Sequence, residues 1–222
     1  RQFALAAAGA SLSVAQDPGL KKIKDITIYS NDLYYCAFPS VVRRPDGELL
    51  VAFRRAPNRR LVGEKGYSHT DPNSYCVLVR SRDGGESWTK EPELIYAHPW
   101  GGSQDPCMVQ LRDGSIVCAS YLWTWLDRVA GAKTVSGRER AQYVFQGGYL
   151  VRSDDGGRTW KGPFYPPPVP GREEKDAFGK PLPAYNRGAM CQRKDGRLCW
   201  IVAYRRGGEG GGTDVHLMTS AD

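Results

Sequence analysis

Apolar residues in this chain come in short runs that are separated by glycine-containing turns. One such unit contains an apolar run, an Asp-Gly pair and a second apolar run, and it occurs three times. The three units span residues 39–53, 106–121 and 188–204. Asp-Gly between apolar runs is a strong signal for a β-hairpin, because the turn needs backbone angles that glycine adopts easily. The pattern therefore predicts three antiparallel hairpins.

A second repeated segment follows the first two hairpins. Residues 81–88 and 153–160 both fit S-x-D-G-G-x-[ST]-W, and a third copy begins at residues 220–222. Two adjacent glycines permit a tight turn that a Cβ would block, and the Asp carboxylate can accept backbone N–H bonds across it. The Trp can then bury its ring beside the hairpin. Each complete unit predicts four strands, and Asp83 and Asp155 are expected to be structural.

The S-x-D-G-G-x-[ST]-W segments resemble the Asp box, the bacterial neuraminidase repeat of sialidase-like propellers. The resemblance implies an all-β fold, a β-propeller of four-stranded blades, with about six blades when complete and about three here. The expected propeller region is 26–222, with blades at about 33–95, 103–165 and 185–222. Three blades cannot close a ring, so we expect an N-terminal fragment that exposes an apolar flank and is inactive alone.

The first fifteen residues resemble the end of an export signal. One Arg precedes a short Ala-rich run, and the small residues Ser13 and Ala15 suit cleavage by signal peptidase. The run is too short to span a bilayer. Because residues 1–5 resemble a truncated twin-arginine signal, we expect an exported bacterial protein, periplasmic or secreted.

The composition narrows the range of partners. The net charge is +7 and the isoelectric point about 9.1, which favours anionic partners. The basic residues are dispersed, so no nucleic acid is expected, and no segment predicts a membrane span. The six cysteines lie in apolar or strand-like runs without metal-ligand spacing. We therefore expect buried thiols and neither a metal nor another cofactor, while disulfide pairing stays open.

The resemblance to sialidases also implies catalytic roles. Sialidases use a Tyr nucleophile assisted by a Glu, an Asp as acid/base, and three arginines that grip the carboxylate of sialic acid. Asp71 stands where the acid/base Asp belongs, although Asp-Pro is also a common start of a turn. Ala37 stands where the first of the three arginines belongs, which puts sialic acid as substrate in doubt. Arg54 and Arg55, and Arg59 and Arg60 in the following loop, are candidates to compensate, and a solvated basic loop is the alternative.

Further candidates lie where the second and third blades begin. Gln104 and Asp105 precede Pro106 in a segment like one whose Asp faces the sialidase pocket, and a plain strand-entry turn is the alternative. Arg187 precedes the first strand of the third blade and is a candidate for anion binding. The remaining arginines, the Glu and the Tyr nucleophile are expected from later blades.

An aromatic stripe follows the second hairpin. Tyr121, Trp123 and Trp125 alternate along a predicted strand, so they are expected to share one face. They are candidates for a platform beneath a sugar ring, with Trp123 as the substrate-binding residue. Core packing between blades is an equally good interpretation.

These features favour an exo-acting glycoside hydrolase of sialidase type that removes a terminal acidic sugar. Its partner would be a glycan or a sialoside-like small molecule. Two alternatives stay open because the fold alone does not determine the activity. One is a non-catalytic Asp-box propeller that binds glycan or protein, and the other is a different propeller glycosidase or lyase on the same scaffold.

Overall fold

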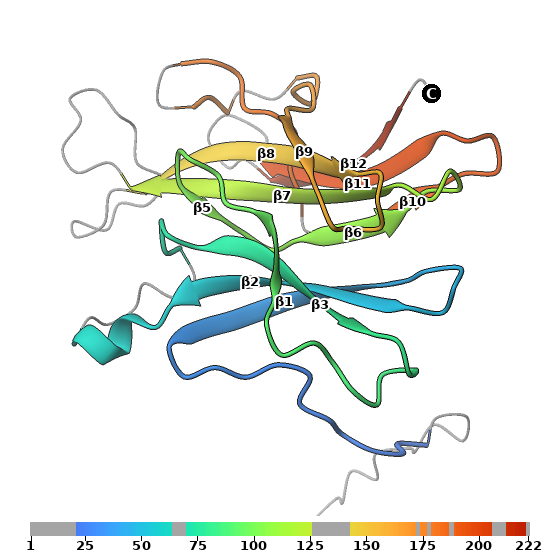
Figure 1. Ribbon diagram of the computed structural model, residues 1–222. Coiled ribbons are helices and arrows are strands. Elements are labelled where there is room, and N and C mark those ends of the chain that lie inside the picture. The colour runs from blue at the N-terminus through green and yellow to red at the C-terminus, as the bar shows by residue number, and fades with distance from the viewer. Residues whose placement is uncertain are drawn as a thin grey trace, which may run out of the picture.

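The computed structural model describes residues 21–63, 70–125, 143–171, 174–176, 179–186, 189–205 and 212–220. These residues form three antiparallel sheets. Figure 1 shows the first sheet as one layer and the second sheet as another layer above it. The expected export signal, residues 1–15, lies outside the described residues.

The strands of each sheet follow one another in sequence. The first sheet contains β1 (Tyr34–Arg43), β2 (Leu49–Pro57), β3 (Tyr75–Ser81) and β4 (Glu93–Tyr96), in that order. The second contains β5 (Gly102–Ser103), β6 (Cys107–Gln110), β7 (Ile116–Trp125), β8 (Tyr143–Ser153) and β9 (Lys161–Phe164), and both β5 and β6 pair with β7. The third contains β10 (Met190–Gln192), β11 (Leu198–Arg205) and β12 (Thr213–Thr219). A short 3-10 helix, η1 (Arg59–Val62), follows β2.

The three predicted hairpins are confirmed. They join β1 to β2, β6 to β7 and β10 to β11. The glycines of the three Asp-Gly pairs, Gly47, Gly114 and Gly196, have φ angles of 89°, 87° and 95°. In each turn the Asp carboxylate accepts a hydrogen bond from the backbone N–H two residues further on. The same local chemistry therefore builds the same turn three times.

The two complete S-x-D-G-G-x-[ST]-W segments also form matching turns. Asp83 Oδ1 accepts from Ser81 Oγ at 2.8 Å and from the N–H of Ser87 at 2.9 Å. Asp155 Oδ1 accepts from Ser153 Oγ at 2.8 Å and from the N–H of Thr159 at 2.9 Å. The pKa of each of the two carboxyls is lowered. The largest cause is the hydrogen bond from the Ser87 or Thr159 side chain, which stabilises the charged form. Both carboxylates are thus tied into their own turns, as expected.

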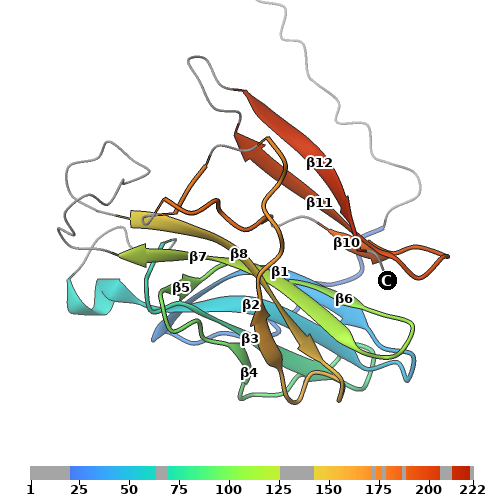
Figure 2. The same cartoon turned by 90° about the horizontal axis from the view of Figure 1, so that it is seen from above.

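The core lies between consecutive sheets. Leu50, Ala52 and Leu78 of the first sheet pack with Ile116 and Tyr149 of the second. Another cluster joins the opposite face of the second sheet to the third, and it includes Val117, Ala119, Trp200 and Val202. Strand β6 contacts both β1 and β10, so it lies between the first strand of the first sheet and the first strand of the third (Figure 2).

The two tryptophans of the repeated turns lie on corresponding faces of their sheets. Trp160 packs against the cluster between the first and second sheets. Trp88 packs on the other face of the first sheet, beside the buried Phe53 and Val77 and the partly buried Tyr29. The first sheet therefore has an apolar layer on both faces.

The structure also bears on the cysteines and on membrane-spanning helices. All six cysteines are free thiols. Burial raises the pKa of the Cys76 thiol to about 12, which keeps it protonated at neutral pH. Among the described residues, no helix has the length and apolar character that crossing a membrane requires.

A cluster of charges lies beside the first Asp-Gly turn. Glu48 is 4% exposed and accepts from Arg44 Nη1 at 2.5 Å and from Arg82 Nε at 3.0 Å, while Arg80 Nη1 lies 3.3 Å away. Burial alone would raise the pKa of Glu48, but the hydrogen bonds from Arg44 and Arg82 and the charge of Arg80 outweigh it. The pKa therefore lies below its ordinary value of 4.5.

This cluster predicts a pH-dependent contribution to stability. Because the folded-state pKa of Glu48 is depressed, its contribution is present above pH 4.5 and disappears as the pH falls through the folded-state value. We expect Glu48→Gln to lower the free energy of unfolding by about 2 kcal/mol at pH 7. The difference from wild type should shrink below about pH 4 in urea titrations. Glu91→Gln, at an exposed site, is the control, and an equal loss at both pH values would contradict the interpretation.

Candidate functional site

Several predicted residues meet at one end of the first two sheets. Strand β1 begins at this end, β2 finishes there, and β3 begins there again, so Ala37, Arg54 and Cys76 lie side by side in the ladder. Gln104 and Asp105 lie just before β6, whose neighbour in space is β1. The antiparallel connections therefore bring segments far apart in sequence to one place.

Arg54 is the centre of this cluster. Its side chain is fully buried, and Nη1 donates a hydrogen bond to Gln104 Oε1. Arg54 lies directly opposite Ala37, and opposed residues share a face of the sheet. The small side chain of Ala37 therefore leaves room on the face that carries the guanidinium. The arginine that the resemblance places at position 37 is absent, but an arginine of the neighbouring strand lies across from that position.

Two aromatic rings cover the Arg54 guanidinium. Its carbon lies 5.3 Å from the ring centroid of Tyr35 and 5.5 Å from that of Phe38. Phe38 has a φ of 58° and is the only residue other than glycine with a positive φ among the described residues. It belongs to a bulge in which Phe38 and Pro39 face the single residue Phe53. Such a conformation costs about 1–2 kcal/mol, so packing around the ring holds it in place.

Asp105 and Gln104 connect Arg54 to the second sheet and to the loop before β3. Tyr121 donates its hydroxyl proton to Asp105 Oδ2 at 2.7 Å, and Gln104 Nε2 donates to Ser74 Oγ at 3.1 Å. Burial lowers the pKa of Arg54, and the negative charge of Asp105 opposes this effect. The cluster thus holds a buried cation next to a buried carboxylate and a phenol.

Asp71 lies close by but is closed off from solvent. Its side chain is fully buried. Oδ2 accepts from Arg59 Nε at 2.7 Å, and Oδ1 accepts from Arg59 Nη2 at 3.3 Å and from the N–H of Asn73 at 2.8 Å. The N–H of Ser103 donates to the carbonyl of Ser74 at 2.9 Å, so the Asp71 loop packs against the segment that leads to Gln104. Asp71 forms a turn and an ion pair at the same time.

Arg55 is separated from this cluster by the alternation of the strand. Its guanidinium carbon lies 3.5 Å from the ring centroid of Tyr34, and 5.8 Å and 6.0 Å from those of Tyr29 and Tyr75. Of Arg54 and Arg55, only Arg54 therefore lies with Gln104. Of the other two candidates to compensate for Ala37, Arg59 pairs with Asp71 and Arg60 is exposed in η1. Arg187, the candidate of the third blade, lies outside the described residues.

The aromatic stripe of β7 packs inward. Tyr121 and Trp123 both contact Phe145, with ring centroids 5.8 Å and 4.9 Å apart, so they share a face as predicted. Tyr121 is buried and Trp123 is partly buried. These contacts fit the packing interpretation of the stripe. The side chain of Trp125 lies outside the described part of the chain.

A cavity of about 420 Å³ lies at the same end of the second sheet, and sequence reasoning missed it. Trp100 and Tyr165 line it and are 67% and 56% exposed. His98 Nδ1 accepts from the N–H of Trp100 at 3.2 Å, so His98 Nε2 carries the proton and donates it to the Tyr165 hydroxyl at 3.0 Å. Burial lowers the pKa of His98 to about 4, which keeps the ring neutral at neutral pH. One signal was available, a Trp between Pro99 and Gly101 in a loop with no core to fill.

The groups at this end of the molecule indicate which kinds of ligand it could bind. Guanidinium binds carboxylates in a bidentate way, and Arg59, whose side chain is 24% exposed, can meet an anionic ligand, whereas Arg54 is fully buried. Exposed aromatic rings around a cavity suit a flat ligand with an apolar face. Within the residues that the structure describes, no group of three His, Cys, Asp or Glu side chains could hold a metal ion.

Comparisons with known proteins place the fold. No family model matches the chain, and no curated protein sequence matches it. A crystal structure of a protein of unknown function from Dyadobacter fermentans DSM 18053 is 50% identical over 92% of this chain, with a TM-score of 0.84. This chain covers 56% of that protein, so it spans little more than half of its length.

More distant structures share the fold at low sequence identity. A family 117 glycoside hydrolase from the marine bacterium Zobellia galactanivorans is 13% identical, with a TM-score of 0.56, and the match covers 90% of this chain and 58% of that one. The NanB sialidase of Streptococcus pneumoniae is 12% identical, with a TM-score of 0.53, over 86% of this chain and 46% of that one. The described residues are thus all-β, with antiparallel sheets in an arrangement shared with propeller glycosidases.

Proposed function

We propose that the protein is an exported glycan-active enzyme that removes a terminal acidic sugar, as an exo-acting hydrolase of sialidase type does. In this proposal the three sheets are blades of a propeller, and the S-x-D-G-G-x-[ST]-W turns are its Asp boxes. The observation that carries it is the Arg59 guanidinium beside Asp71. Its side chain is 24% exposed, so a sugar carboxylate can reach it, whereas Arg54, across from Ala37, is fully buried.

The cavity beside this cluster supports a sugar as substrate. Trp100 and Tyr165 offer exposed ring faces, which suit the apolar faces of a pyranose. Gln146 and Lys180 add polar groups to the lining. Apolar walls with a few convergent polar groups are typical of small-molecule sites.

Asp71 is the acid/base of this proposal, and its ion pair sets a condition on that role. Both of its oxygens accept hydrogen bonds from Arg59, so the carboxyl can exchange a proton with substrate only after Arg59 moves away. The carboxylate of an acidic sugar could take over the guanidinium, whose side chain is 24% exposed. Binding of the substrate would then free the catalytic group.

The two partners of this ion pair give the decisive experiment. The full-length protein would be assayed on fluorogenic sialosides, uronides and neutral glycosides. We expect Asp71→Asn to lower kcat/KM by at least about 100-fold, because general acid catalysis is lost. Arg59→Gln breaks the same ion pair, and we expect it to raise KM while retaining kcat.

The control is Asp32→Asn, at an exposed aspartate before β1, which should keep wild-type activity. Undiminished hydrolysis by Asp71→Asn would remove Asp71 from the mechanism. Equal losses of kcat in Asp71→Asn and Arg59→Gln would show that the pair is structural. Absence of hydrolysis of every acidic glycoside by the wild-type protein would overturn the hydrolase proposal.

A non-catalytic propeller that binds glycan is the second candidate, and the buried Asp71 favours it. If the Asp71 carboxyl stays paired with Arg59, the protein would bind a glycan but would not hydrolyse it. In that case the wild-type protein would bind acidic glycans in calorimetry and release no product. Hydrolysis or elimination confined to a different sugar would instead indicate another glycosidase or lyase, which the absence of an arginine at Ala37 favours.

A further inference from the structure

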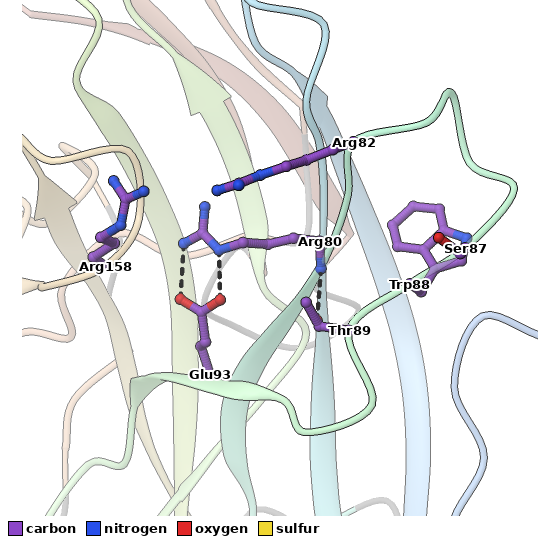
Figure 3. Close-up of a pocket in the computed structure, with 7 residues that line it drawn as sticks. All are labelled: Arg80, Arg82, Ser87, Trp88, Thr89, Glu93 and Arg158. Atoms are coloured by element: carbon purple, nitrogen blue, oxygen red, sulfur yellow. Dashed lines mark hydrogen bonds and ion pairs between the residues drawn. The ribbon is translucent and has the colours of Figure 1, made fainter.

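A second cavity, of about 700 Å³, lies at the opposite end of the first sheet from Arg54. We name it the arginine groove, and its lining includes Arg80, Arg82, Trp88, Thr89, Glu93 and Arg158 (Figure 3). Arg82 belongs to the first S-x-D-G-G-x-[ST]-W turn and Arg158 to the second. Arg80, the residue just before the first turn, connects to the second turn, because its Nη1 donates to the carbonyl of Gly156 at 2.9 Å.

Arg80 is the structural base of the arginine groove. Its Nε and Nη2 donate to the two carboxylate oxygens of Glu93 at 2.5 Å and 2.9 Å. Its Nη1 serves Glu48, at 3.3 Å, in addition to Gly156. The guanidinium is therefore saturated by the protein and has little to offer a ligand.

Arg82 and Arg158 have donors to spare. The side chain of Arg82 is 73% exposed and uses Nε for Glu48 at 3.0 Å, which leaves its two Nη groups for a ligand. Arg158 is exposed and uses Nη1 for the carbonyl of Asp155 at 3.2 Å. Figure 3 shows the Arg82 guanidinium beside that of Arg80, with Arg158 reaching toward them from the facing turn.

Among the described residues, the Asp carboxylates of the two turns form no ion pair with Arg82 or Arg158. Asp83 accepts hydrogen bonds from Ser81 and Ser87, and Asp155 accepts the corresponding bonds within its own turn. The three guanidinium groups of the lining face two carboxylates, Glu93, which pairs with Arg80, and Glu48, which pairs with Arg80 and Arg82. The groove therefore has a local excess of positive charge with fixed, forked donors.

We propose that the arginine groove binds the oxyanion groups of an acidic polysaccharide, as a site separate from the Arg54 cluster. Guanidinium groups on two turns suit a chain that carries repeated sulfate esters or carboxylates, because each fork can grip one anionic group. The choice of a glycan as occupant rests on the proposed function, but binding here needs no turnover.

The test compares charge removal inside and outside the groove. Binding of the full-length protein to dextran sulfate, polygalacturonate and neutral dextran would be measured by calorimetry at low and high salt. We expect binding to a charged polysaccharide that weakens with salt, and a Kd at least about tenfold higher for Arg82→Gln/Arg158→Gln. Arg43→Gln/Arg197→Gln removes the same charge from exposed sites elsewhere and should leave Kd within about twofold of wild type.

Each outcome decides the proposal. A preference for dextran sulfate or for polygalacturonate would identify sulfate ester or carboxylate as the bound group. Equal Kd values for the two double variants, or no binding to either charged polysaccharide, would overturn the site. Binding to duplex DNA as tight as to the polysaccharides, with the same dependence on Arg82 and Arg158, would overturn the glycan as occupant. None of these results depends on whether the Arg54 cluster hydrolyses a glycoside.

Discussion

Replacement of Arg54 by methionine is expected to lower the free energy of unfolding by about 3–5 kcal/mol, the largest effect of any single side chain at the candidate site. The guanidinium is fully buried and balances Asp105, which is only 3% exposed. Without the guanidinium, the Asp105 carboxylate stays buried with no positive charge from residue 54 beside it, and Gln104 Oε1 loses its donor. Urea unfolding at pH 7 measures the loss.

Arg55→Met is the matched control for this prediction. Arg55 neighbours Arg54 on the same strand but lies against tyrosine rings on the other face, so we expect a loss of about 1–2 kcal/mol. The double variant Arg54→Met/Asp105→Asn removes both charges and should recover part of the stability lost in Arg54→Met. Similar losses for Arg54→Met and Arg55→Met would show that Arg54 is not the charge that balances Asp105.

Gly102→Ala is expected to destabilise the protein by about 3 kcal/mol and to displace the Asp71 loop. A Cβ at Gly102 would lie 1.9 Å from the carbonyl oxygen of Asp71 and 2.6 Å from Ser74 Oγ. Backbone cannot yield to a methyl group at that distance, so the contact between the Asp71 loop and the Gln104 segment must open. Thermal unfolding and the chemical shifts of the loop would measure both effects.

The control separates this clash from the general cost of replacing glycine. Gly114 has a φ of 87°, and a Cβ there would meet nothing within 4 Å. We expect Gly114→Ala to cost about 1 kcal/mol through backbone strain alone. A Gly102→Ala protein as stable as Gly114→Ala would contradict the close packing of the two segments.

The hairpins and turns could be predicted because their causes are local. Gly47 and Gly114 adopt the positive φ that an Asp-Gly turn requires, and Asp83 bonds within eight consecutive residues of sequence. Such features need only the chemistry of neighbouring residues. Cys36 is only partly buried and Cys191 is exposed, so the predicted burial holds for four of the six cysteines, Cys76, Cys107, Cys118 and Cys199.

The candidate site was predictable only as a set of residues. Asp71, Gln104 and Asp105 were expected to face a common pocket, but nothing in the sequence pairs Asp71 with Arg59 or opens the bulge at Phe38. The role of Arg54 depends on strand register, since a shift of one residue would turn it to the face that Arg55 occupies. The pair of His98 and Tyr165 is 67 residues apart in sequence and follows from the packing of loops alone.

The self-contained bonding of the repeated turns leaves some of their positions unconstrained. In both turns the Ser hydroxyl links the Asp carboxylate to the N–H of the second glycine, and the side chains of Arg82 and Arg158 take no part in these bonds. Those two positions can change identity without loss of the turn. A rigid frame of this kind can be copied around a molecule and then given new side chains one copy at a time, so that recognition diversifies while the scaffold stays the same.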